Sequence, residues 1–106
     1  PYDPSMKDMS DIAKKFTENW KKAFPGKDPN ALTACGYDSY MLILDAIKRA
    51  KSDDPEKITA AIAATKNFPG VTGNTTINAS HDAEKSVGIM QIQNGKRIFL
   101  TVVEPK

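Results

Sequence analysis

The sequence predicts an α/β chain in which three helices are followed by a short strand and a C-terminal β-hairpin. Two observations lead to this class. Apolar residues recur at spacings of three or four in the first half, as they do on one face of a helix. In the second half, two β-branched runs flank Asn94-Gly95, the pair typical of a tight hairpin turn. A chain of 106 residues has room for one domain with one core.

The first helix is expected over about residues 6 to 24. Ser5-Met6-Lys7-Asp8 resembles a capping box, and Pro25-Gly26 provides a stop. Between them, apolar residues recur at helical spacing: Met9, Ile12, Phe16, Trp20 and Phe24. The opposite face carries lysines diluted by acidic residues, which is typical of an ordinary solvated face.

The second helix is expected over about residues 31 to 51, after the start signal Asp28-Pro29-Asn30. Apolar residues cover most of its circumference, so it should pack on more than one side. Gly36 in its interior is predicted to mark a close approach to a neighbouring element. Cys35 is predicted to be a buried, inert thiol. Because it is the only cysteine, an intramolecular disulfide or a zinc site of cysteine pairs is excluded.

A third helix of about residues 55 to 66 is predicted from Asp53-Asp54-Pro55, which supplies an N-cap and a first-turn proline. Glycines and prolines then break the helix over residues 68 to 74. Thr75-Thr76-Ile77-Asn78 has the β-branched pattern of a short strand, and Ser80-His81-Asp82 that of a turn.

The hairpin is expected to join Val87 to Gln93 with Lys96 to Val103 through a two-residue turn. This turn would set Val87, Ile89 and Gln91 opposite Val102, Leu100 and Ile98 on one face. Met90 and Phe99 would pair on the other face. Since both faces are partly apolar, the hairpin should pack against another element on at least one side.

Residue chemistry predicts no catalytic or metal site. His81 is the only histidine and has no nucleophile or carboxylate suitably held against it, so a surface turn is the simpler interpretation. The loop Gly70-Val71-Thr72-Gly73-Asn74 resembles an anion-binding nest, but it follows a helix and precedes a strand, the reverse of a phosphate loop. It is therefore interpreted as structural punctuation. No carboxylates have metal-ligand spacing with a histidine or cysteine.

Composition excludes two further classes of function. The net charge is only +2, and the fifteen lysines and arginines are scattered rather than gathered in one stripe, so a nucleic-acid partner is not expected. The longest apolar run, Tyr40 to Leu44, is far shorter than the roughly 20 residues that cross a bilayer.

The chain begins Pro-Tyr-Asp-Pro without an initiator methionine or signal-peptide pattern. We therefore expect a processed product, an excised fragment or a trimmed form of a longer protein.

Three stretches, in this order, resemble the carboxyl-terminal part of periplasmic binding proteins of branched-chain amino acid ABC transporters, the leucine/isoleucine/valine-binding type. They are FTENWKKAFPGKDPN, ACGYDSYMLILDAIKRAKSDDPEKITAAI and FPGVTGNTTINASHDAEKSVGIMQIQNGKR. The most specific elements are Gly36-Tyr37-Asp38, Asp54-Pro55 and Gly70-Val71-Thr72-Gly73. Residues 78 to 82 depart from the family pattern, which commonly has an aromatic residue, an acid and a glycine there.

The resemblance implies a fragment of a two-lobe extracytoplasmic receptor that delivers an amino acid to an ABC permease. Residues 1 to 74 would form the helical part of the first lobe after the second crossover, and residues 75 to 85 the third crossover strand and its turn. Residues 86 to 106 would form the terminal hairpin of the second lobe. The hinge or crossover residues would be Gly73, Asn74, Thr75, Thr76, Ile77 and Asn78. The ligand-contacting positions of the family lie upstream, so none is assigned to this segment, and neither enzyme activity nor a cofactor is implied.

A receptor fragment would have lost the sheet that its second helix covers. Because large exposed apolar patches are uncommon on monomers, the isolated chain is expected to form a homo-oligomer or an exchanged dimer. The alternative hypothesis is a free-standing α/β module that associates with itself or a partner and binds no small molecule. An enzyme that needs a partner chain to complete its site is a third. Sequence alone leaves open which amino acid, amide or aromatic acid the parent binds.

Overall fold

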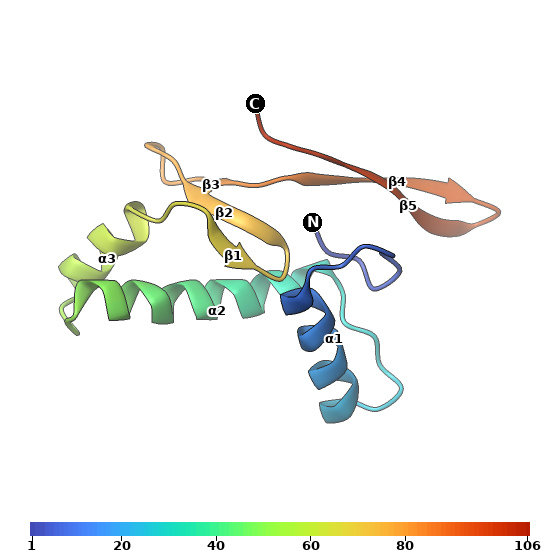
Figure 1. Ribbon diagram of the computed structural model, residues 1–106, viewed down its shortest axis with the longest axis horizontal. Helices are drawn as coiled ribbons and strands as arrows, with labels where there is room; N and C mark the ends of the chain where they lie inside the picture. Colours follow the sequence, from blue (N-terminus) through green and yellow to red (C-terminus); the bar gives the residue numbers. More distant parts are fainter.

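The computed structural model describes residues 1 to 106 and contains three helices followed by five strands (Figure 1). The helices are α1 (Asp11–Ala23), α2 (Ala31–Ala50) and α3 (Pro55–Ala63). The strands are β1 (Phe68–Gly70), β2 (Gly73–Ile77), β3 (Ala83–Glu84), β4 (Val87–Gln93) and β5 (Lys96–Val103). The predicted α/β class, with helices first and a hairpin last, is confirmed.

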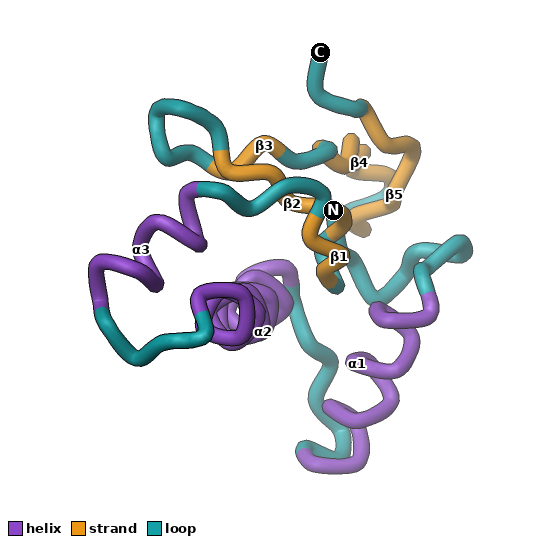
Figure 2. Tube along the Cα trace, turned by 60° about the vertical axis from the view of Figure 1, so that its left-hand side comes forward, coloured by secondary structure: helices purple, strands orange, loops and turns teal.

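Helix α2 is the central element of the structure. Figure 2 shows it nearly end-on, with α3 and α1 on either side and the strands above it. The Asn30 side chain caps it by accepting a hydrogen bond from the Thr33 amide at 3.0 Å, and Lys51 ends it in the left-handed conformation. Both ends agree with the sequence prediction to within one residue.

Two expectations for α2 are wrong. Cys35 is exposed rather than buried, and a Cβ added at Gly36 would meet no atom within 4 Å. The two residues differ in their physical reason: Cys35 borders an open cavity, whereas no other element of this chain comes close to Gly36. The apolar pattern around α2 correctly indicates several packing sides, but only some of those sides have a partner within the chain.

Helix α1 begins later than predicted. Ser10, not Ser5, is its N-cap, and the Ser10 hydroxyl accepts from the Ala13 amide at 3.2 Å. Ser5 instead donates from its amide and its hydroxyl to the carboxylate of Asp3, two residues earlier. The expected capping box is therefore absent because Ser5 closes a local turn with a preceding acid.

Helix α3 ends at Ala63, a few residues before the predicted end. Its N-terminus is as predicted, since the Asp54 carboxylate accepts from the Glu56 amide at 3.0 Å and Pro55 opens the first turn. At the other end, Ala64 is the C-cap, and the Thr65 amide donates to the Ile62 carbonyl at 3.0 Å, which tightens and closes the last turn. Arg49 of α2 donates to the Thr65 hydroxyl at 2.9 Å, which fixes the end of α3 against α2.

The short strands form a three-stranded antiparallel sheet in the order β1, β2, β3. Only β2 was expected. Phe68 of β1 pairs with Thr75, and Gly70 pairs with Gly73 across the turn Val71-Thr72. The sequence prediction treated Pro69 and Gly70 only as helix breakers, and it missed that they lie opposite a strand-forming segment.

The hairpin of β4 and β5 has the predicted turn, with positive φ at Asn94 (49°) and Gly95 (73°). Near the turn the predicted register is confirmed, since Gln91 pairs with Ile98 and Met90 with Phe99.

Beyond these pairs the predicted register of the hairpin is wrong. Ile89 pairs with Thr101, and Val87 with Val103, because an irregularity between Ile89 and Met90 leaves Leu100 as an extra residue. A bulge of this kind shifts every later pair and cannot be read from alternation alone.

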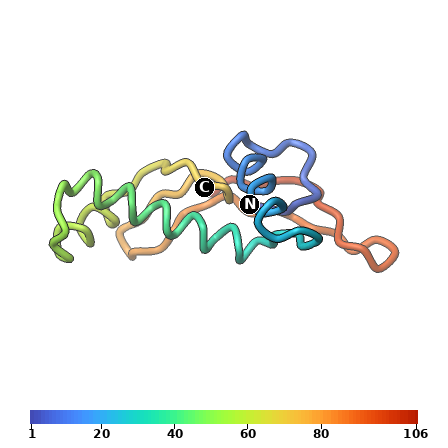
Figure 3. Tube along the Cα trace, turned by 90° about the horizontal axis from the view of Figure 1, so that it is seen from below, coloured from blue at the N-terminus to red at the C-terminus, as the bar shows by residue number.

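The core of the chain is small. Only 14 of 106 residues are buried, and the apolar cluster consists of Tyr2, Ala13, Phe16, Ala34 and Val71. The radius of gyration is 15.5 Å, whereas a compact domain of this length has about 13 Å. Figure 3 shows why, since the hairpin extends beyond the end of α2. The chain thus leaves much apolar surface open, and none of its helices has the length and hydropathy needed to cross a membrane.

Candidate functional site

Asp38 is the best-defined polar centre of the structure. It lies inside the apolar helix α2, is only 6% exposed, and points at the turn between β1 and β2. Its Oδ1 accepts from the Val71 amide at 2.7 Å, and its Oδ2 accepts from the Thr72 amide at 2.8 Å. A carboxylate held by two backbone amides satisfies both turn donors and its own charge, so it fixes the turn to α2.

Lys85, which follows β3, completes this centre. Its Nζ lies 3.8 Å from Asp38 Oδ2 and donates a hydrogen bond to the Thr72 hydroxyl, which in turn lies 2.6 Å from Asp38 Oδ2. An ammonium can only donate and a carboxylate can only accept. The Thr72 hydroxyl therefore accepts from Lys85 and donates to Asp38, so the direction of the chain of hydrogen bonds is determined. We call these three residues the Asp38 relay.

Gly70 makes room for the Asp38 relay. A Cβ added at this position would lie 2.6 Å from Asp38 Oδ2 and 2.8 Å from its Cγ, closer than real Cβ atoms approach. The absence of a side chain lets the carboxylate reach the turn amides.

The glycine-rich loop 70 to 74 is therefore an anion cradle whose anion is a side chain of the same chain. The sequence interpretation of a structural loop rather than a phosphate site agrees with this geometry. What the interpretation missed was the partner. A buried acid in the middle of an apolar helix needs hydrogen-bond donors. Asp38 is such an acid, and the loop contains backbone amides that can donate. This signal in the sequence could have predicted that the loop contacts α2.

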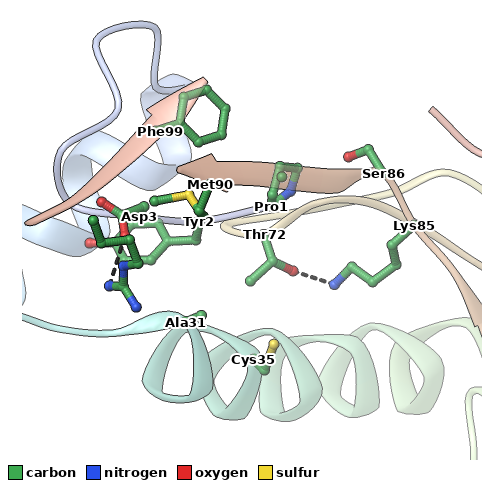
Figure 4. A pocket seen from close by; sticks show the side chains of 12 residues that line it. Pro1, Tyr2, Asp3, Ala31, Cys35, Thr72, Lys85, Ser86, Met90 and Phe99 are labelled. Carbon is green, nitrogen blue, oxygen red and sulfur yellow. Dashed lines mark hydrogen bonds and ion pairs between the residues drawn. The ribbon is translucent and has the colours of Figure 1, made fainter. Parts of the chain in front are cut away.

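A cavity of about 300 Å³ adjoins the relay (Figure 4). It lies between the N-terminal end of α2 and the hairpin, and Cys35, Lys85, Met90 and Phe99 are among its lining residues. Figure 4 shows Lys85 reaching across one end of it to Thr72. Arg97, the second basic side chain at the cavity, is also paired. The cavity is therefore partly apolar, and both of its basic side chains are engaged with acids.

Arg97 of β5 forms an ion pair with Asp3, joining the hairpin to the N-terminal segment at 2.9 Å between Nη2 and Oδ2. Burial raises the pKa of the Asp3 carboxyl, but hydrogen bonds from Ser5 and the charge of Arg97 outweigh burial and hold this pKa below its ordinary value. Asp3 is therefore ionised in the neutral range, where the ion pair is intact.

The predicted hinge residues Gly73, Asn74, Thr75, Thr76 and Ile77 make up β2, the middle strand of the three-stranded sheet. Gly73 has a φ of 99°, which requires glycine, and Thr75 is buried. Asn78 follows the strand, and its side chain accepts from the amides of Ser80 and Asp82. No observation tests their hinge role, which stays a prediction.

The other candidates carry no further chemistry in the structure. His81 lies in an exposed turn, as predicted, with a positive φ of 66°. The structure contains no cluster of three or more histidine, cysteine, aspartate or glutamate residues that could hold a metal ion.

Comparison with known proteins identifies the family. Residues 2 to 97 match the family described as periplasmic binding protein. Among curated proteins no significant match was found. The leucine-binding protein LivK of Thermotoga maritima is 45% identical to the chain, with a TM-score of 0.83, over 98% of this chain and 29% of that protein.

Two further solved structures have the same fold. LivJ of Streptococcus pneumoniae, a branched-chain amino acid transporter substrate-binding protein in complex with isoleucine, is 32% identical, with a TM-score of 0.81, over 95% of this chain and 28% of that protein. A solute-binding protein of R. palustris in complex with benzoate is 20% identical, with a TM-score of 0.78, over 98% of this chain and 28% of its own, and shows the fold alone.

The chain spans about 29% of the length of the first of these relatives. Within that span, the motifs Gly36-Tyr37-Asp38 and Gly70-Val71-Thr72-Gly73, which carried the sequence resemblance, are the two segments that the Asp38 relay joins. With the family match over residues 2 to 97, these observations agree on one assignment. This chain belongs to the periplasmic binding protein family of ABC transporters.

Proposed function

We propose that this chain is part of an extracytoplasmic substrate-binding protein that captures a branched-chain or related amino acid and delivers it to an ABC permease. The observation that carries the proposal is the 45% identity to a leucine-binding protein over 98% of the chain. The 32% identity to a second protein, which holds isoleucine, supports the same ligand class.

Within the receptor, residues 1 to 74 belong to the first lobe, residues 75 to 85 to the third crossover and its turn, and residues 86 to 106 to the second lobe. Packing supports the boundary between the crossover and the second lobe. Helix α2 contacts both α3 and β1, and β1, β2 and β3 pair in one sheet, while β4 and β5 pack mainly on each other. Lys85 and Ser86, which have no strand partner, connect the two parts.

This chain contributes architecture rather than ligand contacts. Its two buried acids, Asp3 and Asp38, are paired with the cations Arg97 and Lys85. The two basic side chains at the cavity, those of Lys85 and Arg97, are thus already paired with acids, so neither is free to bind the carboxylate of an amino acid. We therefore place the ligand contacts in other parts of the receptor, and the role of the receptor is binding rather than catalysis.

Isothermal titration calorimetry of the natural polypeptide that carries this chain tests the proposal. Leucine, isoleucine and valine are titrated in turn, with aspartate and lysine as charged comparisons. Saturable binding of at least one of the three apolar amino acids is expected, with no heat from the charged ones. Absence of binding to every amino acid in the panel would contradict the proposed function.

Exposed apolar residues favour self-association as a second role for the isolated chain. Leu32 and Tyr40 on α2 are 82% and 63% exposed, and Ile92 on the hairpin is 69% exposed. Such surface requires a cover, from the rest of the receptor or from a second copy. Light scattering of the isolated chain at micromolar concentration should find a dimer or larger species. A stable monomer would contradict self-association. Separately, millimolar or tighter binding of an amino acid by the isolated chain would contradict the proposal that this chain makes no ligand contacts.

A further inference from the structure

The Asp38 relay spans the segment that is predicted to cross between the lobes. Thr72 lies one residue before Gly73 and Lys85 lies after β3, so their side chains meet across the stretch that contains β2, its turn and β3. Asp38, on the long helix α2, is the third member of the relay. A contact between these residues therefore closes a loop around the whole predicted crossover.

The hairpin has few other attachments to the rest of the chain. Lys85 and Ser86 form no strand pairs, although strands precede and follow them. Apart from this connection, the only ion pair between the hairpin and the remaining chain is that of Arg97 with Asp3, and the Arg97 side chain is 60% exposed. The side chain of Lys85 is 24% exposed and that of Asp38 is 8% exposed. The Lys85 contact is thus the better shielded of the two, and less screened by salt.

We propose that Lys85 is a positioning residue that, through Thr72 and Asp38, sets the orientation of the β4–β5 hairpin relative to α2 and thereby favours the ligand-competent arrangement of the lobes. The proposal rests on the proposed function. Without the ammonium, the backbone at Lys85 and Ser86 has no side-chain anchor on α2, and it samples more orientations. Ligand binding must then order this segment. The apparent affinity falls in proportion to the fraction of molecules whose hairpin has the binding-competent orientation.

The cavity beside the relay does not offer a simpler role for Lys85. A lysine that bound an anionic ligand there would have to leave Asp38, and a buried carboxylate would lose its counter-ion. The existing contacts of Lys85 account for its position completely.

The test uses the natural polypeptide with Lys85→Met, which keeps side-chain length and removes the charge. Spin labels are placed at Lys57→Cys on α3 and Gln93→Cys at the hairpin, in a Cys35→Ser background; Lys57 and Gln93 are exposed. Double electron–electron resonance then measures the distance distribution without ligand. We expect a broader distribution for Lys85→Met and the original width for Lys85→Arg, since arginine can also donate to Thr72.

Leucine titration of the same variants, without labels, measures the consequence for binding. Lys85→Met should raise Kd about 5- to 20-fold, and Lys85→Arg should restore most of the affinity. Lys66→Met is the matched control, because Lys66 is an exposed lysine without an ion pair, and it should leave both readouts unchanged. If leucine does not bind the unmodified protein, isoleucine or valine takes its place.

The outcomes separate this inference from the proposed function. If the unmodified protein binds no amino acid, the proposed function fails, and the label distances still judge the positioning role. An unchanged distribution in Lys85→Met would overturn that role. So would an unchanged or lower Kd in a folded Lys85→Met protein, because the anchored orientation would then not be the competent one.

Discussion

Two regions of α2 differ in how completely this chain satisfies them. Asp38 is surrounded, with Val71, Thr72 and Lys85 all in place around its carboxylate. Leu32 and Tyr40, on the same helix, are largely exposed. The polar centre is therefore complete within these residues and the apolar surface is not. Burying a carboxylate without its partners costs several kcal/mol of folding free energy. Leaving an apolar side chain exposed until another surface packs on it costs less.

The largest expected effect comes from Asp38→Ala. This change leaves two turn amides and the Lys85 ammonium without their acceptor, and removing one member of a buried ion pair costs about 3–5 kcal/mol. Urea unfolding at fixed protein concentration measures it. Asp45→Ala is the control, since Asp45 pairs with Arg49 on the same helix but is 41% exposed, and about 1 kcal/mol or less is expected there. Equal losses would mean that Asp38 is no better supported than a surface acid.

Glycine substitutions on the two sides of this contact should have opposite signs. Gly70→Ala places a Cβ 2.6 Å from the Asp38 carboxylate, and the displacement should cost about 1–3 kcal/mol. Gly36→Ala meets nothing within 4 Å, and it should stabilise the helix by up to about 1 kcal/mol in the isolated chain. The same unfolding measurement compares them. A stabilising Gly70→Ala would show that the turn can move away from Asp38 freely.

Exposed apolar residues of α2 can be tested by charge. Replacing Tyr40, which is 63% exposed, with glutamate should weaken self-association of the isolated chain at least about tenfold, because a charge must then be buried in the contact. Sedimentation or light scattering across a dilution series measures the shift. Lys57→Glu on α3 gives the matched control, with no change expected. Persistent association of Tyr40→Glu would place the contact on the hairpin instead.

The smallest expected effect is on how the stability of the chain depends on pH. Hydrogen bonds from Ser5 and the charge of Arg97 outweigh burial and lower the pKa of Asp3 in the folded chain, so the ionised carboxylate contributes stability above its unfolded pKa. This contribution is lost as the pH falls through the lower folded pKa. Asp3→Asn should therefore destabilise the chain slightly at pH 6 and make its stability less dependent on pH below about 4. Identical pH profiles for the two proteins would exclude this contribution.

Local signals predicted the local structure well. Asn30 and Asp54 do cap α2 and α3, and Asn94-Gly95 does form the hairpin turn, because each depends on residues within a few positions. Ser5 and Leu100 show the limit of such signals. Ser5 bonds backward to Asp3, and Leu100 is displaced by a bulge, so neither agrees with its local pattern.

For the candidate site, sequence analysis found both halves but not their connection. Asp38 and the loop at Gly70 were singled out by family resemblance, and the loop was correctly taken as structural. Their hydrogen bonds join residues 33 and 34 positions apart, which no local rule predicts. Cys35 was misplaced for a related reason, because burial depends on which side of α2 receives a neighbour.

Sequence patterns were enough to predict the three helices, the strand β2 and the hairpin in their order, as well as the hairpin turn and the family, since caps, periodicity and short motifs act over a few residues. Only the folded structure shows that Asp38 meets Thr72 and Lys85, that β1 and β3 flank β2, and which apolar residues stay exposed. These features depend on contacts between distant segments. Their free energy comes from desolvation and charge pairing, which depend on the folded geometry and are absent from any local pattern.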